Sequence, residues 1–183
     1  MRTEVIEILI VDDHSIVREG LKRILADIPD VKVAAEAGNG ADAMAILRNN
    51  PIDLVLLDLS LPGRTGLEVL QFMKSEFRKL PVLILSAHEE DQYAVRALRD
   101  GADGFLNKQS APERLVSAIR KVAAGGKYVS PEMAERLAAE VGGRTDKLSH
   151  EALSDREFMV LKMIAAGKSL NQIADQLSIS PKT

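Results

Sequence analysis

The sequence predicts an α/β fold built on a doubly wound parallel sheet, followed by a small all-helical unit. Over the first 125 residues, five short apolar runs alternate with five segments of helical periodicity. This alternation is typical of strand–helix repeats that form a parallel sheet. The run Asp53-Leu-Val-Leu-Leu57 is continuously apolar after its first residue, which suits a strand covered by helices on both faces.

The expected strands are the apolar runs Ile6–Val11, Val31–Ala35, Ile52–Leu57, Pro81–Leu85 and Gly104–Leu106. The expected helices lie between them, over Ser15–Ile28, Gly40–Asn49, Gly66–Phe77, Asp91–Asp100 and Pro112–Ala124. In the first helix the apolar residues fall on one stripe, and this stripe comprises Ile16, Leu21, Ile24, Leu25 and Ile28. We expect Ser15 to cap that helix and Pro112 to open the last one.

Gly125-Gly126 ends the repeats, so we expect one domain over residues 1–125, a linker with a short helix over 126–147, and a second unit over 148–183. In the second unit, Ser154-Asp-Arg-Glu157 and Ser169-Leu-Asn-Gln172 are typical of capping boxes that open helices. Ser180-Pro181 is typical of the start of a third helix.

Composition narrows the class of protein. With 46% apolar and 28% charged residues, the chain can bury a core and remain soluble. It has no cysteine, which excludes disulfides and thiolate metal sites. No apolar run approaches the length of a membrane span, and the N-terminus does not resemble a secretory signal. We therefore expect a cytoplasmic protein. Residues 126–183 carry equal numbers of acidic and basic side chains, so charge alone does not support nucleic-acid binding.

Polar residues mark the ends of four expected strands: Asp12-Asp13, Asp58, Ser86 and Lys108. Parallel strands bring these ends to one edge of the sheet. Two carboxylates about 4 Å apart repel by about 4 kcal/mol at an effective dielectric near 20, so the cluster calls for a hard cation. Oxygen ligands favour Mg²⁺, and a carboxylate beside Mg²⁺ and a lysine is placed to accept a phosphoryl group. Taken alone, each acid would more often be a turn residue than a metal ligand.

With Leu61-Pro62 and Gly66 added, this constellation makes residues 1–125 resemble a receiver domain of two-component signalling. The resemblance implies a flavodoxin-like fold with strand order 2-1-3-4-5. The segment from Leu153 through Ile173-Ala174 to Thr183 resembles the helix-turn-helix of LuxR/NarL-type response regulators.

The receiver resemblance implies roles for the clustered residues. Asp58 would be the phosphoacceptor, and its partner would be a sensor histidine kinase or phosphotransfer protein. Asp13, Asp58 and the backbone carbonyl of Ser60 would ligate Mg²⁺ directly, and Asp12 would act mainly through a bound water. Ser86 and Lys108 would each bind a phosphoryl oxygen.

Four further positions have open interpretations. Phe105 stands at the aromatic switch position of the family, but core packing explains it equally well. Ser60 and His88 flank the path of a hydrolysing water, so we expect them to set the lifetime of the phospho-aspartate rather than its formation. Gln109 stands where many receivers have a proline after a cis peptide, and we favour a trans peptide here. His14 and His150 receive no role.

The resemblance also frames the function. In the helix-turn-helix fold the recognition helix enters the major groove, and here it would begin at Pro181 and continue past Thr183. We therefore expect a partial chain that lacks most of the recognition helix and does not bind DNA specifically. The complete regulator would bind promoter DNA and homodimerise after phosphorylation. The dimer surface could be the first and fifth helices, or the face from the fourth helix to the fifth.

Two alternatives stay open. One is a phosphorylation-dependent protein-interaction module with no DNA role. The other is an aspartyl-phosphate hydrolase of small molecules, which we disfavour because Ser60 stands where such enzymes carry a second aspartate. We expect no enzymatic activity beyond self-catalysed phosphotransfer and autodephosphorylation.

Overall fold

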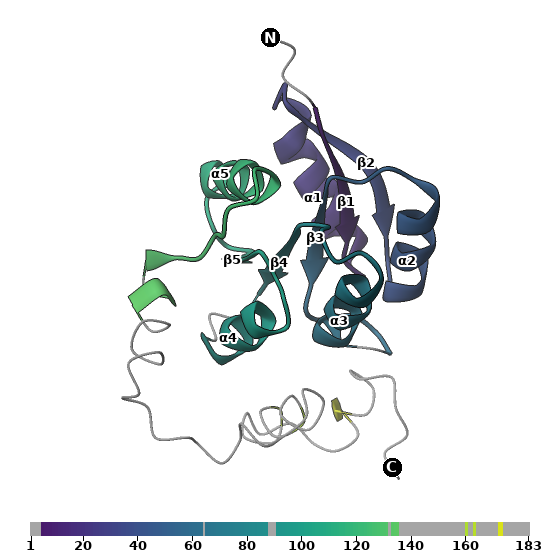
Figure 1. Ribbon diagram of the computed structural model, residues 1–183, viewed down its shortest axis with the longest axis vertical. Coiled ribbons are helices and arrows are strands. Elements are labelled where there is room, and N and C mark those ends of the chain that lie inside the picture. The colour runs from purple at the N-terminus through teal and green to yellow at the C-terminus, as the bar shows by residue number, and fades with distance from the viewer. Residues whose placement is uncertain are drawn as a thin grey trace.

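The computed structural model describes residues 5–63, 65–87, 91–131 and 133–135, together with the single residues 160, 163, 172 and 173. Strands and helices alternate along this part of the chain (Figure 1). In order, they are β1 (Ile6–Val11), α1 (Ser15–Ala26), β2 (Val31–Ala37), α2 (Gly40–Asn49), β3 (Leu54–Asp58), α3 (Gly66–Glu76), β4 (Val82–Ser86), α4 (Asp91–Arg99), β5 (Gly104–Asn107) and α5 (Pro112–Ala123).

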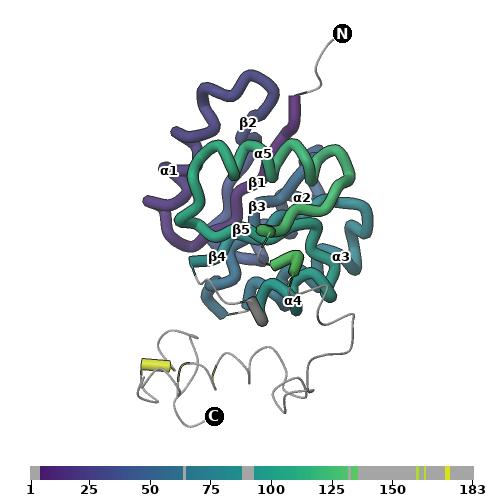
Figure 2. Tube along the Cα trace, turned by 90° about the vertical axis from the view of Figure 1, so that its left-hand side faces the viewer, coloured from purple at the N-terminus to yellow at the C-terminus, as the bar shows by residue number. Residues whose placement is uncertain are grey.

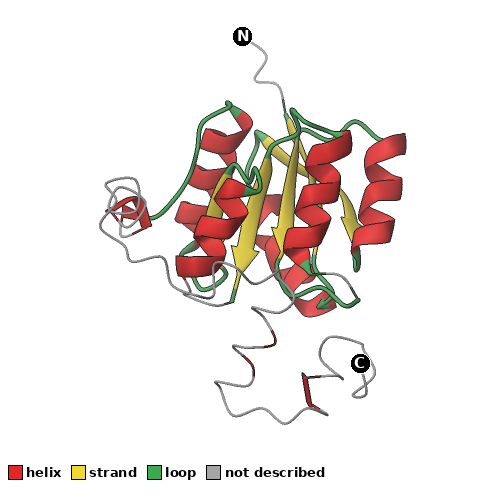
Figure 3. Cartoon of the chain, turned by 60° about the horizontal axis from the view of Figure 1, so that its bottom comes forward, coloured by secondary structure: helices red, strands yellow, loops and turns green. Residues whose placement is uncertain are grey.

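The five strands form one parallel sheet in the order β2-β1-β3-β4-β5. Their arrowheads all point toward the same edge, and helices cover both faces (Figure 3). This confirms the predicted flavodoxin-like architecture. From β1 the chain adds β2 on one side and then β3, β4 and β5 on the other side. The carboxyl ends of β1 and β3 therefore lie at the switch point of the strand order, where ligands bind in such sheets.

Each face of the sheet has its own apolar core. One core joins the sheet to α1 and α5 through residues such as Leu25 and Ile119. The other joins it to α2, α3 and α4 through residues such as Met44, Leu70 and Ala97. Figure 2 shows α1 and α5 together on the first of these faces. Within the described residues, every helix is too short or too polar to cross a membrane.

The predicted apolar stripe of α1 is too wide. Leu25 is buried and Leu21 packs against the core, but Ile16 is 82% exposed and Ile24 is also exposed. Ile16 and Ile24 lie on the i, i+4, i+8 row that passes through Gly20, about 100° around the helix from the row of Leu21 and Leu25. The sheet covers only the second of these rows.

The predicted cap of α1 is also wrong. Ser15 is the first helical residue, and His14 occupies the N-cap position with extended backbone angles and no side-chain cap. The entry to α5 is as predicted, with Ala111 at the N-cap and Pro112 in the first turn. The described part of the chain contains no cis peptide bond, so the Lys108–Gln109 peptide is trans, as favoured from the sequence.

The chain that follows α5 returns to the outer edge of β5. Tyr128 forms a parallel bridge with Gly104. The Phe105 N–H donates to the Tyr128 carbonyl at 2.9 Å, and the Tyr128 N–H donates to the Asp103 carbonyl at 3.0 Å. A helical turn then begins after Ser130, and Met133 is buried against the core shared with α2, α3 and α4.

The short helix predicted within the linker thus begins near Ser130. The domain boundaries themselves remain predictions. The first capping box and the helix start at Ser180-Pro181 lie outside the described residues, and of the second capping box only Gln172 lies within them.

Candidate functional site

The carboxyl edge of the sheet brings four of the predicted site residues together. Asp12 directly follows β1, Asp58 and Ser86 are the last residues of β3 and β4, and Lys108 follows β5. Neighbouring strands are in register at this edge, because Asp58 lies beside Leu85 and Ser86 lies beside Asn107. Residues far apart in the sequence therefore meet at one place, as we expected.

Lys108 joins the two buried carboxylates of this edge. Its Nζ lies 2.6 Å from Asp12 Oδ2 and 2.9 Å from Asp58 Oδ2. Asp12 and Asp58 are each only 2% exposed. Burial alone would lower the pKa of Lys108, but its contacts with the negative charges of Asp12 and Asp58 outweigh that effect and hold the pKa above its ordinary value. The lysine is therefore a permanent cation at neutral pH.

Every polar atom of Asp12 has a partner. Its Oδ1 accepts the His14 N–H at 2.8 Å and its Oδ2 accepts Lys108 Nζ. Its own N–H donates to the Ala37 carbonyl at 3.1 Å, and its carbonyl accepts Arg18 Nη1 at 2.7 Å. The Asp12 carboxylate is thus already committed to protein donors.

Asp58 is different, because neither of its carboxylate oxygens has a hydrogen-bond partner among the described residues. The Lys108 ammonium, 2.9 Å from Oδ2, attracts this carboxylate as an ion pair. Burial raises the pKa of Asp58, Lys108 opposes the rise, and the negative charge of Asp12 adds to it. A buried carboxylate without donors is costly, so this oxygen pair is suited to a cation or to a covalent partner.

Four side chains at this edge could hold a metal ion. Asp12, Asp13, His14 and Asp58 each offer one ligand atom, and these atoms all lie within 4.8 Å of one another. Asp13 is the most accessible of the three carboxylates, with its side chain 32% exposed. Three carboxylates, one of which (Asp58) is buried and has no hydrogen-bond partner among the described residues, fit a hard divalent cation.

His14 was given no role from the sequence, yet it lies in this cluster. Its Nδ1 is 2.7 Å from Asp13 Oδ1 and 3.3 Å from Asp12 Oδ1. Its position next to the acidic pair was the only signal in the sequence. Arg18 was also missed, because nothing in the helical pattern distinguishes a side chain that turns back to the preceding strand.

The loop that follows Asp58 is held by tight packing at the start of α3. The Gly66 N–H donates to the Leu59 carbonyl at 2.9 Å, and a Cβ at Gly66 would clash with the Asp58 carbonyl oxygen. Thr65 and Glu68 form a reciprocal capping box at the same helix start. Ser60, two residues past Asp58 in this loop, is exposed.

The remaining predicted residues are placed as follows. Ser86 is buried at the end of β4, and Phe105 is buried in the core on the side of α2, α3 and α4. His88 lies outside the described residues.

Comparison with known protein families agrees with this geometry. Residues 8–120 match the model of the response regulator receiver domain, and residues 151–183 match that of bacterial regulatory proteins of the luxR family. The chain belongs to the LuxR-type response regulators. It thus combines the receiver of a two-component system with a DNA-binding helix-turn-helix unit.

Relatives in this family align over almost the whole chain. The response regulator UvrY of Escherichia coli is 38% identical over 179 residues, which cover 97% of this chain and 82% of UvrY. The response regulator GacA of Pseudomonas aeruginosa is 36% identical over 179 residues, which cover 97% of this chain and 84% of GacA.

Solved structures give the same assignment. A two-component response regulator of the LuxR family from Aurantimonas superposes with a TM-score of 0.71 at 35% identity, over 76% of this chain and 99% of that chain. RcsB of Salmonella enterica bound to the rprA promoter superposes with a TM-score of 0.68 at 26% identity, over 98% of this chain and 86% of that chain.

Proposed function

We propose that Asp58 accepts a phosphoryl group from a sensor histidine kinase or phosphotransfer protein in a Mg²⁺-dependent reaction, and that this transfer controls promoter binding. The observation that carries the proposal is the buried Asp58 carboxylate, which lies 2.9 Å from the Lys108 ammonium and whose oxygens lack a hydrogen-bond partner among the described residues. A nucleophile without donors keeps its lone pairs available for attack, and a fixed cation beside it stabilises the transferring group.

Phosphoryl transfer to Asp58 needs no reactant besides the phosphohistidine. An Asp58 oxygen attacks the phosphorus of a phosphohistidine, the phosphorus–nitrogen bond breaks, and the imidazole nitrogen keeps the electron pair. In autodephosphorylation, water attacks the same phosphorus, the bond to Asp58 breaks, and inorganic phosphate leaves. In this proposal these two self-catalysed steps are the only chemistry of the chain.

In this proposal Mg²⁺ is held by Asp13, Asp58 and the backbone carbonyl of Ser60, while Asp12 acts through a water. The bonds that occupy both Asp12 oxygens support this division, because Asp13 is the more accessible acid. When bound, the cation neutralises charge on the phosphoryl oxygens. Lys108 supplies a second positive charge for those oxygens.

Other residues have supporting roles in the proposal. Ser86, at the end of the neighbouring strand, binds a phosphoryl oxygen, and Phe105 in the adjacent β5 responds to its movement. Core packing alone still explains the burial of Phe105. Exchanges at Ser60 and His88 change the lifetime of the phospho-aspartate more than its formation.

The downstream partners are promoter DNA and a second copy of the chain. The match of residues 151–183 to the luxR family favours the DNA role over a purely protein-binding one. For the phosphorylation-dependent homodimer, the exposed Ile16 and Ile24 favour the surface formed by α1 and α5, where Ile24 and Leu115 line a shared groove.

Intact-mass measurement after incubation with Mg²⁺ and acetyl phosphate tests the central step. We expect a gain of one phosphoryl group, which disappears in Asp58→Asn and when the divalent cation is chelated. Asp53→Asn is the matched control, because Asp53 precedes the same strand at its opposite end and should leave the gain unchanged. Phosphorylation that persists in Asp58→Asn would contradict the proposal.

A further inference from the structure

Arg18 connects three elements around the acidic pair. Its side chain, only 19% exposed, extends from α1 toward the end of β1. Its Nη1 donates to the Asp12 carbonyl at 2.7 Å, and its Nε donates to Glu36 Oε2 in β2 at 2.9 Å. Lys22, one turn later in α1, donates to the other Glu36 oxygen at 2.8 Å. Glu36 therefore holds the guanidinium in place.

The carbonyl that Arg18 grips belongs to the peptide between Asp12 and Asp13. A peptide unit is planar, so fixing this oxygen also fixes the direction in which the Asp13 backbone leaves the strand. The Asp12 side chain is held separately by His14 and Lys108. Among the described contacts, Asp13 has only the exposed His14 imidazole as a side-chain partner. The placement of the Asp13 carboxylate thus depends on this peptide.

We infer that Arg18 is a positioning residue of the metal site, which orients the Asp12–Asp13 peptide and so keeps the Asp13 carboxylate within reach of Asp58. Glu36 completes the device by orienting Arg18. A guanidinium presents several donors in a rigid fork and can therefore grip a carbonyl and a carboxylate together. The inference rests on the proposed function for its choice of cation, but metal binding is measurable without phosphotransfer.

The test is calorimetric titration of the full chain with Mg²⁺. Loss of a residue that orients a metal ligand typically weakens metal binding about 10–100-fold, and we expect Arg18→Ala to raise the Mg²⁺ dissociation constant about tenfold. Arg18→Lys keeps the charge but loses the fork, so we expect an intermediate value. Glu36→Gln should also weaken binding, by less than Arg18→Ala.

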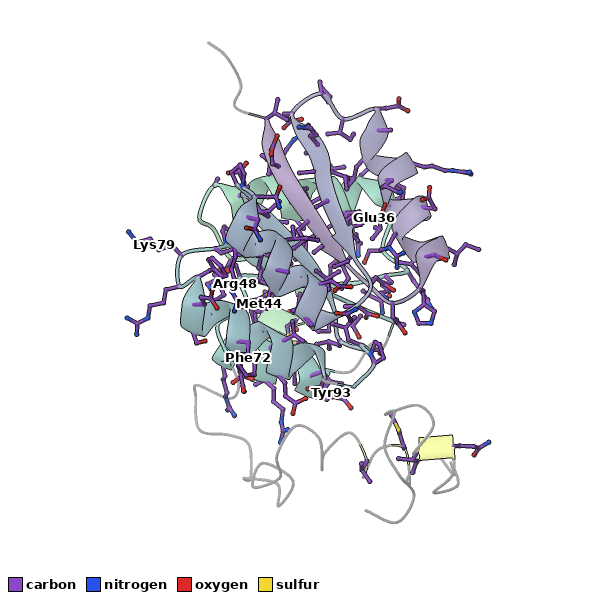
Figure 4. All side chains as sticks on the ribbon, turned by 90° about the vertical axis from the view of Figure 1, so that its right-hand side faces the viewer. Glu36, Met44, Arg48, Phe72, Lys79 and Tyr93 are labelled. Atoms are coloured by element: carbon purple, nitrogen blue, oxygen red, sulfur yellow. The ribbon has the colours of Figure 1, made fainter. Side chains whose placement is uncertain are left out.

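Arg48→Ala is the matched control. Arg48 also makes a two-bonded contact with a glutamate, because its Nε and Nη2 each lie 2.8 Å from an oxygen of Glu76. This pair joins α2 to α3, and Arg48 and Glu36 lie well apart in Figure 4. Arg48→Ala removes an exposed ion pair but leaves the contact of Arg18 with the Asp12 carbonyl. Its Mg²⁺ dissociation constant should therefore stay within about twofold of the parent.

A second readout separates positioning from a general loss of structure. At saturating Mg²⁺, Arg18→Ala should regain most of the parent rate of phosphorylation by acetyl phosphate, because excess cation compensates for weak binding. If the Mg²⁺ dissociation constant of Arg18→Ala equals that of the parent, or rises no more than that of Arg48→Ala, the inference is wrong. If Arg18→Ala does not fold, Arg18→Lys and Glu36→Gln decide by the same measurement.

The two proposals fail in distinguishable ways. Phosphorylation of the parent combined with an unchanged Mg²⁺ affinity in the Arg18 variants would overturn the inference and leave the proposed function intact. If Mg²⁺ binding is weaker in those variants but Asp58 of the parent is not phosphorylated, the inference stands and the proposed function is wrong. A parent chain that does not bind Mg²⁺ would overturn both.

Discussion

Replacing Lys108 by methionine removes the cation that lies between two buried carboxylates while keeping a side chain of similar length. At an effective dielectric near 20, Coulomb's law gives roughly 6 kcal/mol of gross attraction for each of the contacts at 2.6 and 2.9 Å. Desolvation offsets much of this, and removing one partner of a buried ion pair costs about 3–5 kcal/mol net. We therefore expect Lys108→Met to lower the free energy of unfolding by about 3–5 kcal/mol at neutral pH.

The pH dependence of this loss has a definite sign. Burial and the charge of Asp12 raise the pKa of Asp58, and Lys108 is the main group that opposes the rise. Without the lysine, the folded variant takes up a proton on Asp58 more readily than the unfolded chain does. The difference in unfolding free energy between parent and variant is therefore full at neutral pH and shrinks as the pH falls toward the acidic range.

Urea denaturation of parent and variant across this pH range, with and without Mg²⁺, is the assay. Mg²⁺ should stabilise Lys108→Met more than the parent, because it replaces the missing positive charge. Lys32→Met is the control, since Lys32 also makes an ion pair, 2.7 Å from Glu7, but is 62% exposed and should cost less than about 1 kcal/mol. Equal losses in the two variants, or a loss in Lys108→Met that does not change with pH, would refute the reasoning.

Four further substitutions test packing, capping and charge in the receiver fold by urea denaturation. Gly66→Ala places a Cβ against the Asp58 carbonyl and should cost about 3 kcal/mol, whereas Gly20→Ala, in open space on α1, should stabilise by about 0.5–1 kcal/mol. Thr65→Ala removes the capping box of α3 and should cost about 1 kcal/mol. Asp103→Asn should cost about 1–3 kcal/mol at neutral pH. Burial alone would raise the pKa of Asp103, but its bonds from Lys127 and Lys74 hold it below the ordinary value, so this last cost should vanish as the pH falls through that pKa.

The part of the site that the sequence predicted is the part set by topology. Asp58 and Lys108 are fifty positions apart in the printed sequence, yet each ends an apolar strand, and parallel strands must bring such ends together. The same logic placed Asp12 and Ser86. No side-chain conformation has to be known for this inference, because the sheet alone dictates the meeting point.

The unpredicted contacts depend on how separate elements meet. Arg18 looks like an ordinary polar residue of a helix, and its bond to the Asp12 carbonyl exists only because α1 packs beside the end of β1. Ile16 and Leu25 are both apolar at helical spacing, but only the packed structure shows which row of α1 the sheet covers. Gly66 is required by a close approach of backbone, and a sequence alone does not distinguish this need from an ordinary turn.

The return of the chain to the outer edge of β5 affects how a receiver fragment should be prepared. Tyr128 satisfies the backbone N–H of Phe105, and Met133 is buried in the same apolar core as Phe105. A fragment that stops at Ala124 would leave this strand open, with a free amide ready to pair with a neighbouring molecule. Self-association of such a short fragment would then reflect the missing residues rather than a natural contact between receivers, and a fragment extended to Glu135 would avoid it.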